Sequence, residues 1–281
     1  MTRLAYLGTP QMAVPPLLAL VDAGFQVTDV VTGADARRGR GSTLSPSPVK
    51  QAALDAGLQV HHRVDDLLGL GIDLGVVVAF GQLIRPHVLA EIPMVNLHFS
   101  LLPRWRGAAP VERALLAGDE VTGVSLMQLD EGLDTGPVYS MVEVPIGATA
   151  TADQLRGRLV DAGTQLLIDG LRNGLGTPVA QAGEPTYASK LDPGELRIDW
   201  SRPVVQIDRL IRLGGAWTTL HGRRLKVHQA EVVGDQISNQ LVDGVVGGLR
   251  LVRVQPEGKP PMEFTDFARG ARLQPVEQLG E

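Results

Sequence analysis

Two short segments carry the residue types best suited to chemistry. Residues 96–107 read Asn-Leu-His-Phe-Ser-Leu-Leu-Pro-Arg-Trp-Arg-Gly, and residues 132–136 read Gly-Leu-Asp-Thr-Gly. Side chains alternate along a strand, so a strand at the start of the first segment would place Asn96 and His98 on one face. Asp134 would complete a polar trio. In acyl transfer, an amide and an imidazole can stabilise a developing oxyanion, while a carboxylate orients the ring and favours its protonated form.

The attacking group is expected to belong to a substrate. The chain contains neither a cysteine nor a Gly-x-Ser-x-Gly elbow that would supply a nucleophile. A structural interpretation of the trio stays open on these residues alone. A lone histidine on an apolar strand is more often a hydrogen-bonded core residue than a catalyst, Asn96 can end a strand, and Asp134 has turn-forming glycines on both sides.

Apolar runs and helical patterns alternate around the first segment. The runs are bounded by Gly, Pro or Asp, as buried parallel strands are, and cover residues 4–7, 27–31, 74–80 and 95–99. Helices that each stop before a glycine are expected over residues 13–23, 48–56 and 110–117. This alternation predicts an α/β fold with a Rossmann-like, mostly parallel sheet. Such sheets bind ligands at the carboxyl ends of their strands, where the first segment would lie.

The second half of the chain predicts a change of architecture. Strands over residues 123–129 and 138–144 would flank the Asp134 loop and turn it back towards His98. A capping box at Thr151 and Gln154 precedes a long amphipathic helix. Beyond it, a helix and short alternating segments with glycine turns predict a small antiparallel β-barrel, OB-like in type. We expect a catalytic domain over residues 1–185, a linker over 186–202 and the barrel over 203–281.

Composition limits the class of protein. With 281 residues, two domains are expected; 44% hydrophobic and 20% charged residues are ordinary for a globular protein. The absence of cysteine suits a reducing cytoplasm, and no signal peptide or membrane-length apolar run is present, so we expect a cytoplasmic protein with no membrane association. The net charge of -5 argues against general nucleic-acid binding, yet residues 201–281 hold 11 Lys/Arg against 9 Asp/Glu. That part could face phosphates.

The order Asn-x-His-x-Ser-Leu-Leu-Pro, then Gly-Leu-Asp-Thr-Gly, resembles the folate-dependent formyltransferases. Nearly the whole chain shares the resemblance, which is strongest to members that act on initiator tRNA, through residues 45–50, 101–110, 187–200 and 254–259. It implies 10-formyltetrahydrofolate as formyl donor and the α-amino group of methionyl initiator tRNA as acceptor, at the start of translation. By resemblance, Asn96 and protonated His98 hold the oxyanion, and Asp134 is the third catalytic residue, able to pass a proton through water to the leaving folate nitrogen.

The resemblance also nominates binding residues. The folate positions are Phe80, Gly81, Gln82, Leu83, Ile84, Ser100, Leu101, Leu102, Pro103 and Asp130. An acceptor carboxylate and backbone groups would suit the donor-rich edge of a pterin, although the apolar members could equally be core residues. The tRNA positions are Arg37, Arg38, Arg40, Arg104, Arg106, Arg209, Arg212, Arg223, Arg224 and Lys226. Each of these cations could instead be a solvated or ion-paired surface residue.

Two other functions remain to be distinguished. A formyltransferase of the same superfamily could act on an amino-sugar nucleotide, and a non-catalytic protein could simply bind tRNA. A metal site at His61 and His62 is not expected, because adjacent side chains on a strand point apart. A nicotinamide-dependent dehydrogenase is not expected either, because Gly8-Thr9-Pro10 follows the first strand in place of a full Gly-x-Gly-x-x-Gly. No protein partner is evident.

Overall fold

The computed structural model describes residues 2–37 and 44–281, which form two compact units. The first unit comprises residues 1–111, 121–145 and 156–189, and the second comprises residues 112–120, 146–155 and 190–281. The sequence predicts different limits, with a linker over residues 186–202, and these limits remain a proposal. No helix in the described part of the chain is both long and apolar enough to cross a membrane.

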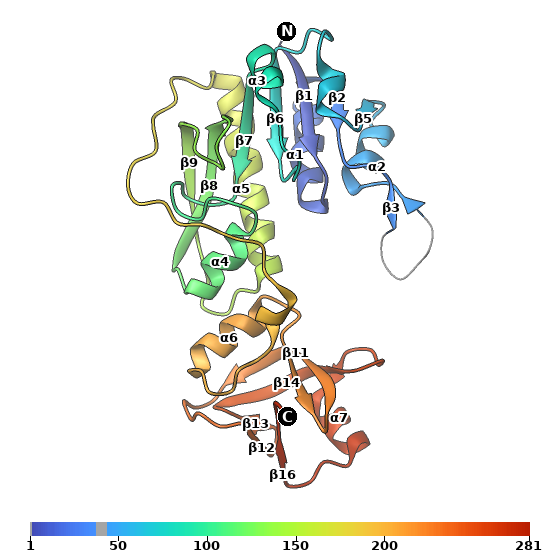
Figure 1. Ribbon diagram of the computed structural model, residues 1–281, viewed down its shortest axis with the longest axis vertical. Helices are drawn as coiled ribbons and strands as arrows, with labels where there is room; N and C mark the ends of the chain where they lie inside the picture. Colours follow the sequence, from blue (N-terminus) through green and yellow to red (C-terminus); the bar gives the residue numbers. More distant parts are fainter. Residues whose placement is uncertain (1, 38–43) are drawn as a thin grey trace. The chain divides into compact units, whose positions relative to one another are not determined.

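The first unit is built on a sheet with the strand order β5-β2-β1-β6-β7-β8-β9 (Figure 1). Neighbouring strands from β5 to β7 are parallel, and the last two strands are antiparallel. The strands are β1 (Arg3–Gly8), β2 (Gln26–Val31), β5 (Gln59–His61), β6 (Leu74–Val78), β7 (Met94–His98), β8 (Val121–Gln128) and β9 (Val138–Pro145). The chain leaves β1 towards β2 and later returns to its other side at β6, so a topological switch point lies between β1 and β6.

Helices and short turns connect these strands. They are η1 (Gln11–Ala13), α1 (Val14–Asp22), α2 (Pro48–Asp55), η2 (Val64–Leu67), α3 (Pro86–Glu91), α4 (Pro110–Ala117) and α5 (Ala152–Asn173), with a small hairpin of β3 (Ala36–Arg37) and β4 (Leu44–Ser45). Capping residues in the sequence explain where two of these helices begin. Ser47 caps α2 by accepting from the Lys50 amide at 2.9 Å, and the predicted capping box before α5 forms between Thr151 and Gln154.

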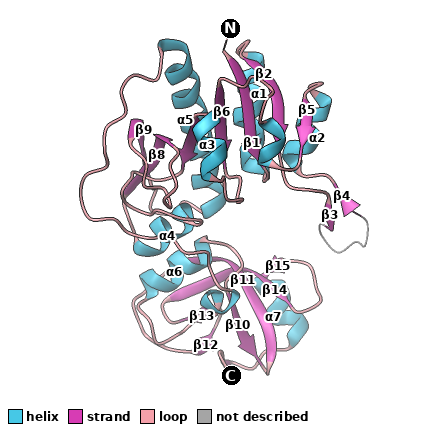
Figure 2. Ribbon diagram, turned by 45° about the horizontal axis from the view of Figure 1, so that its top comes forward, coloured by secondary structure: helices cyan, strands magenta, loops and turns pink. Residues whose placement is uncertain are grey.

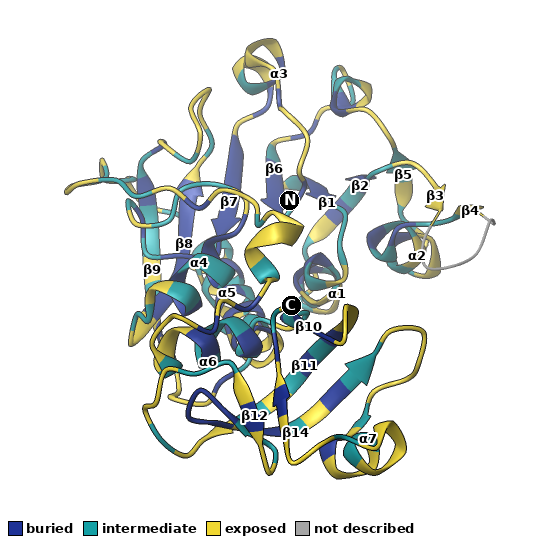
Figure 3. Cartoon of the chain, turned by 60° about the horizontal axis from the view of Figure 1, so that its bottom comes forward, coloured by how far each residue is buried: buried dark blue, intermediate teal, exposed yellow. Residues whose placement is uncertain are grey.

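The buried side chains fix which face of β7 is left for chemistry. Strands β6, β7 and β8 are almost wholly buried, as the dark blue of Figure 3 shows. Helix α5 approaches one face of β7 at Gly163, where an added Cβ would lie 3.0 Å from the Leu97 side chain. Because side chains alternate, Asn96 and His98 project from the opposite face. Burial of the Leu97 face under α5 therefore orients the polar pair.

The second unit is an antiparallel sheet with the order β10-β11-β14-β13-β12-β16 (Figure 2). Its elements are η3 (Pro193–Leu196), α6 (Val204–Arg212), β10 (Trp217–Leu220), β11 (Arg223–Val232), β12 (Gln240–Val242), β13 (Val245–Val246), β14 (Leu249–Pro256), β15 (Met262–Glu263), α7 (Phe264–Ala271) and β16 (Val276–Gln278). A bridge between Leu220 and Leu279 joins the two edges of this sheet, so the strands close around a core that includes Trp200, Ile207 and Leu249. The predicted fold class, a Rossmann-like sheet followed by a small antiparallel barrel, is confirmed.

One strand boundary was wrong in a way that affects the site. The strand expected over residues 74–80 ends at Val78, because Ala79 adopts a left-handed conformation with a φ of 47°. The chain therefore turns before Phe80, and residues 80–84 form a loop at the carboxyl end of β6. Since β6 and β7 are parallel neighbours, this loop begins at the same edge of the sheet as the segment after His98.

Candidate active site

Strand β7 supplies the first two members of the predicted trio. It lies between β6 and β8, with Asn96 opposite Met127 and His98 opposite Ser125 on β8. Both side chains are buried, with exposed fractions of 9% and 6%. Polar groups buried to this degree need hydrogen-bond partners.

Asp134 reaches the same place from the loop between β8 and β9. Its Oδ1 accepts from Asn96 Nδ2 at 3.5 Å, and its Oδ2 lies 3.6 Å from His98 Nδ1. The Gly107 amide donates to the same Oδ2 at 2.8 Å. Thus the three side chains predicted from spacing converge, and a backbone amide from the loop after β7 joins them.

The contacts of His98 assign different tasks to its two ring nitrogens. Nε2 lies 2.9 Å from the backbone carbonyl oxygen of Trp105, an acceptor, so the hydrogen resides on Nε2. Nδ1 lies on the side of Asp134, 3.6 Å from its Oδ2. A neutral ring offers a lone pair at Nδ1, whereas an imidazolium offers a second N–H donor there. Nδ1 is therefore the ring nitrogen left for chemistry, while the contact at Nε2 holds the orientation of the ring.

The loop after β7 is shaped so that its backbone can meet the trio. Ser125 Oγ donates to the Ser100 carbonyl at 2.7 Å and accepts from the Leu102 amide at 3.2 Å. Gly107 has a φ of 120°, and an added Cβ would lie 2.9 Å from the Ala188 carbonyl oxygen. Only glycine suits this position, which directs an amide at Asp134.

The nominated folate residues after β6 divide between core and surface. Phe80 and Ile84 are buried in the apolar core of the first unit, as the structural alternative expected. Gly81 and Gln82 are exposed, and the Leu83 side chain is 82% exposed, which is unusual for a large apolar group. Gln82 and Leu83 thus stand free to contact a ligand, and the ligand role of the whole set remains a prediction.

The other nominated folate residues have structural contacts. Asp130 accepts from the Gly132 amide at 3.1 Å and from the Thr135 hydroxyl at 2.8 Å, so it shapes the Asp134 loop. Ser100 is fully buried and donates to the Arg104 carbonyl at 2.5 Å. Leu102 packs with Met127 and Val138. Leu101 and Pro103, on either side of Leu102, are partly exposed.

Among the arginines nominated for tRNA in the first unit, Arg38 and Arg40 lie outside the described residues. Arg37 is exposed at the end of β3. The guanidinium of Arg104 stacks over the Trp105 ring at 4.4 Å. Arg106 instead donates to Gln181 Oε1, from Nη2 at 2.7 Å and from Nε at 3.1 Å.

The nominated cations of the second unit also differ in their contacts. Arg209 Nη1 donates to the Ala117 carbonyl, and Arg212 pairs with Asp208 on its own helix. Arg224 is exposed and lies 4.2 Å from the centre of the Trp217 ring. The neighbouring side chain, Arg223, is exposed at the start of β11, and Lys226 is partly buried further along that strand. The start of β11 therefore presents the most accessible of these charges.

Sequence reasoning missed three groups that complete the site. The Trp105 carbonyl and the Gly107 amide are backbone atoms, so their residue types gave no direct signal. Gln181 lies in an irregular segment, yet its Nε2 donates to the carbonyls of Asp134 and Gly136 at 2.8 Å each.

The adjacent histidines considered as metal ligands lie outside this site. His61 contacts Asp29, and His62 contacts the Thr32 carbonyl.

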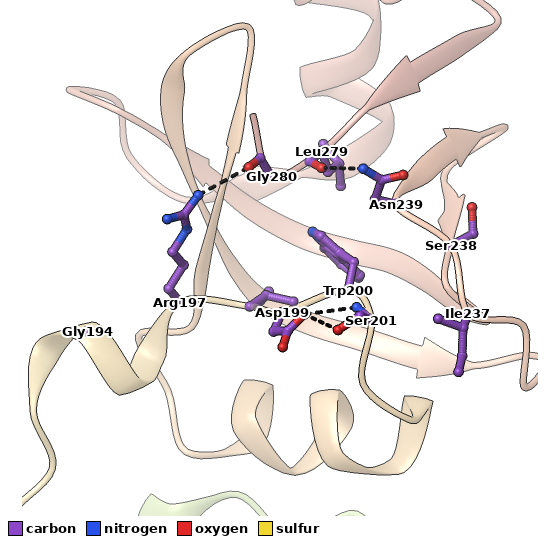
Figure 4. A pocket seen from close by; sticks show the side chains of 11 residues that line it. Gly194, Arg197, Asp199, Trp200, Ser201, Ile237, Ser238, Asn239, Leu279 and Gly280 are labelled. Atoms are coloured by element: carbon purple, nitrogen blue, oxygen red, sulfur yellow. Dashed lines mark hydrogen bonds between the residues drawn. The ribbon is translucent and has the colours of Figure 1, made fainter.

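Two recesses of the described residues lie away from the trio. One pocket of about 710 Å³ belongs to the second unit and is lined by Arg197, Asp199, Trp200, Asn239 and neighbouring residues (Figure 4). Its polar groups are engaged with one another, as when Arg197 donates to the Gly280 carbonyl at 3.1 Å. The hydroxyl and amide of Ser201 lower the pKa of Asp199 below its ordinary value. Another recess, of about 590 Å³, is lined by residues of α1, α2 and Ser45–Ser47.

Comparisons with known proteins cover nearly the whole chain. The pattern of the formyl transferase family matches residues 2–171, and that of the formyl transferase C-terminal domain matches residues 190–272. The methionyl-tRNA formyltransferase of Thermobifida fusca is 43% identical to this chain over 309 residues, which cover 99% of each chain. That of Streptomyces coelicolor is 42% identical and covers 99% of this chain and 100% of its own.

A solved structure shows the same fold. The crystal structure of the N-formyltransferase from Helicobacter canadensis, in complex with folinic acid and dTDP-3-aminofucose, has a TM-score of 0.69 to this chain. It covers 91% of this chain and 100% of its own at 18% identity, so the likeness extends to the fold alone.

Proposed function

This chain belongs to the formyl transferase family, and from that premise we propose that it transfers the formyl group of 10-formyltetrahydrofolate to the α-amino group of methionyl initiator tRNA. The similarity to enzymes named for the tRNA acceptor runs through both units. The observation that carries the chemistry is the convergence of Asn96, His98 and Asp134, with Asp134 on the Nδ1 side of the histidine ring. The proposed acceptor, an aminoacylated initiator tRNA, belongs to translation, so we place the protein in the cytoplasm.

The trio can perform acyl transfer without an enzyme nucleophile. The amine nitrogen forms a bond to the formyl carbon, and the bond from that carbon to the folate nitrogen breaks. One proton leaves the amine and one reaches the leaving nitrogen, so protons balance. An oxyanion exists after the new bond forms and before the bond to the folate nitrogen breaks. Asn96 Nδ2 and the Nδ1–H of protonated His98 would stabilise it, and Asp134 would orient the ring and carry a proton through water.

The residues around the trio suit a folate co-substrate. A pterin needs an apolar wall and acceptors for its N–H groups, and exposed Leu83 with the backbone of residues 80–84 could supply both. Asp130 already holds its own loop, so any contact from it to the pterin would use the remaining acceptor capacity of its carboxylate. For tRNA, we propose that Arg223 and Arg224 contribute phosphate contacts from the second unit.

An amino-sugar nucleotide is the alternative acceptor, as in the Helicobacter canadensis complex. The full-length relatives above 40% identity act, by their names, on methionyl-tRNA, whereas the sugar-related structure shares only the fold. A tRNA-binding protein without catalysis would have no use for a trio converging on a histidine nitrogen. Neither alternative is favoured.

The acceptor test offers both substrates together. Purified protein is incubated with formyl-labelled 10-formyltetrahydrofolate, methionyl initiator tRNA and an amino-sugar nucleotide. We expect label in the tRNA fraction alone, and none when the tRNA carries no methionine. Label in the sugar nucleotide with none in the tRNA would overturn the proposed acceptor.

A further inference from the structure

An irregular segment of the first unit connects the two loops that form the site. We call residues 179–188 the strap. Its Val179 exchanges two backbone hydrogen bonds of 2.8 Å with Val138 on β9. Further along, Thr186 Oγ1 accepts from the Trp105 amide at 2.9 Å, and the Thr186 carbonyl accepts from the Arg106 amide at 2.8 Å. The strap therefore binds the loop after β7 at one end and the hairpin β8–β9 at the other.

Gln181 uses both ends of its amide within the strap. Its Nε2 donates to the carbonyl oxygens of Asp134 and Gly136, at 2.8 Å each. Its Oε1 accepts two hydrogen bonds from the guanidinium of Arg106, at 2.7 Å and 3.1 Å. Both donor positions and the acceptor of one side chain are thus occupied by groups of the two site loops.

The Asp134 backbone lies in a less common conformation. Its φ is 51°, in the left-handed region, which aspartate tolerates better than most non-glycine residues. On the far side of the loop, an added Cβ at Gly136 would lie only 1.9 Å from the Gln128 carbonyl oxygen, so the loop is closely packed there. Holding the two carbonyls fixes where the Asp134 carboxylate lies, and the 3.6 Å separation from His98 Nδ1 leaves little tolerance for movement.

We infer that Gln181 is a positioning residue that sets the Asp134 carboxylate against His98, and that Arg106 holds Gln181 in place. The inference rests on the proposed formyl transfer. It gives Arg106 a task inside the site in place of the tRNA contact expected from its charge, because its guanidinium is already committed to Gln181.

Two variants distinguish the donor role of the Gln181 amide from its acceptor role. Gln181→Met keeps the length of the side chain and removes every hydrogen bond. Gln181→Glu keeps an acceptor for Arg106 and has no N–H for the two carbonyls. The matched control is Gln165→Met, because Gln165 is exposed on α5 and donates to Asp169 one turn away, outside the site.

Both Gln181 variants should lower kcat by roughly tenfold to a hundredfold, the range for a slightly misplaced catalytic group, with KM for each substrate within about twofold of wild type. In an Asp134→Asn background, Gln181→Met should lower kcat by less than about twofold further, because it acts through Asp134. A Gln181 variant that matches the control in kcat, or one that lowers kcat by the same factor with and without the Asp134 carboxylate, overturns the inference.

A measurement without turnover separates this inference from the proposed function. The His98 ring nitrogen signals in an NMR spectrum of the full chain, assigned by their loss in His98→Asn, report its contact with Asp134. They should move in Gln181→Met in the direction seen in Asp134→Asn, and stay in place in the control. Unmoved signals would overturn the inference even if wild type formylates tRNA. If the signals move in Gln181→Met but the wild-type protein transfers no formyl group, only the proposed function is overturned.

Discussion

His98 shows how one residue type serves two purposes in the site. Its Nε2 is engaged by the Trp105 carbonyl, so only Nδ1 faces the other members of the trio. Strand alternation and loop order predict that Asn96, His98 and Asp134 lie together. They do not predict that a carbonyl and the Gly107 amide hold these residues, because backbone atoms are common to all residues and their direction depends on the fold. Gln181 was missed because it lies 47 residues from Asp134 in a segment without periodicity.

Removing the amide of Asn96 tests the oxyanion assignment. Asn96→Ala should lower kcat about a hundredfold or more, equivalent to roughly 3 kcal/mol for one oxyanion donor. Steady-state formylation kinetics would measure this, with KM for both substrates nearly unchanged. Thermal unfolding of the same variant provides the control for folding. A kcat close to wild type in a folded variant would remove Asn96 from the chemistry.

A methyl group at Gly107 tests the backbone contact to Asp134. Gly107→Ala places a Cβ at a φ of 120° and 2.9 Å from the Ala188 carbonyl oxygen. We expect a loss of about 1–3 kcal/mol in stability from this strain, together with reduced kcat as the amide moves away from the carboxylate. Gly157→Ala is the matched control, since Gly157 lies on the exposed face of α5 and its Cβ would meet nothing within 4 Å; this variant should gain about 0.5–1 kcal/mol of stability. Equal kcat in both variants would contradict the role of the Gly107 amide.

At the scale of elements, segments with a clear apolar or helical pattern were predictable, including the short strand β10 (Trp217–Leu220), and segments without such a pattern were not. Strands β1 and β6 follow short apolar runs, and α4 coincides with the predicted residues 110–117. Strand β5 holds only Gln59–His61, and β16 holds Val276–Gln278, both with little apolar pattern. Their pairing depends on distant partners such as Gln240 opposite Gln278, which no local pattern reports.

A polar cluster joins the edge strand β5 to the sheet. The buried carboxylate of Asp29 on β2 contacts His61 Nε2 at 2.8 Å, the Thr28 hydroxyl at 2.7 Å and Arg3 Nη2 at 3.5 Å. Burial acts to raise the pKa of Asp29, but the hydrogen bonds from Thr28 and His61, with the charges of His61 and Arg3, outweigh it. The pKa therefore lies below the ordinary value of 3.8.

The lowered pKa predicts how stability depends on pH. A carboxyl group with a lowered folded pKa stabilises the fold above its unfolded pKa, and this contribution is lost as the pH falls through the folded value. Asp29→Asn should cost about 2 kcal/mol at neutral pH, the scale of hydrogen bonds to a charged group. Urea unfolding at several pH values measures the difference in free energy of unfolding between wild type and Asp29→Asn. This gap should narrow only below the ordinary carboxyl pKa. The control Asp35→Asn, at a more exposed ion pair with Lys50, should change stability by less than about 0.5 kcal/mol. A gap that stays constant down to strongly acidic pH would contradict this account.

At the scale of the whole molecule, charge is distributed unevenly along the chain. The chain has a net charge of -5, while residues 201–281 carry 11 Lys/Arg against 9 Asp/Glu. The Rossmann-like unit contains the trio, and the barrel presents Arg223 and Arg224 at the exposed start of β11. This distribution suits a protein that performs chemistry with one unit and contacts the tRNA backbone with the other.

Neutralising the start of β11 tests that division. The double variant Arg223→Gln with Arg224→Gln should raise KM for tRNA and leave KM for the folate donor and kcat unchanged. The slope of log affinity against log salt should fall by about one to two, since each phosphate contact contributes nearly one. Arg269→Gln on α7, where a similarly exposed arginine pairs with Asp266, is the control and should alter neither quantity. An unchanged salt slope in the double variant would assign tRNA binding to other residues.

The most direct test of the central claim identifies the product on the tRNA itself. Methionyl initiator tRNA is incubated with 10-formyltetrahydrofolate and either wild type or His98→Ala, and the amino acid is released and identified by mass spectrometry. The account predicts N-formylmethionine with wild type and unmodified methionine with the variant, while the variant still binds both substrates. Unmodified methionine with wild type, or equal formylation by both proteins, would contradict it.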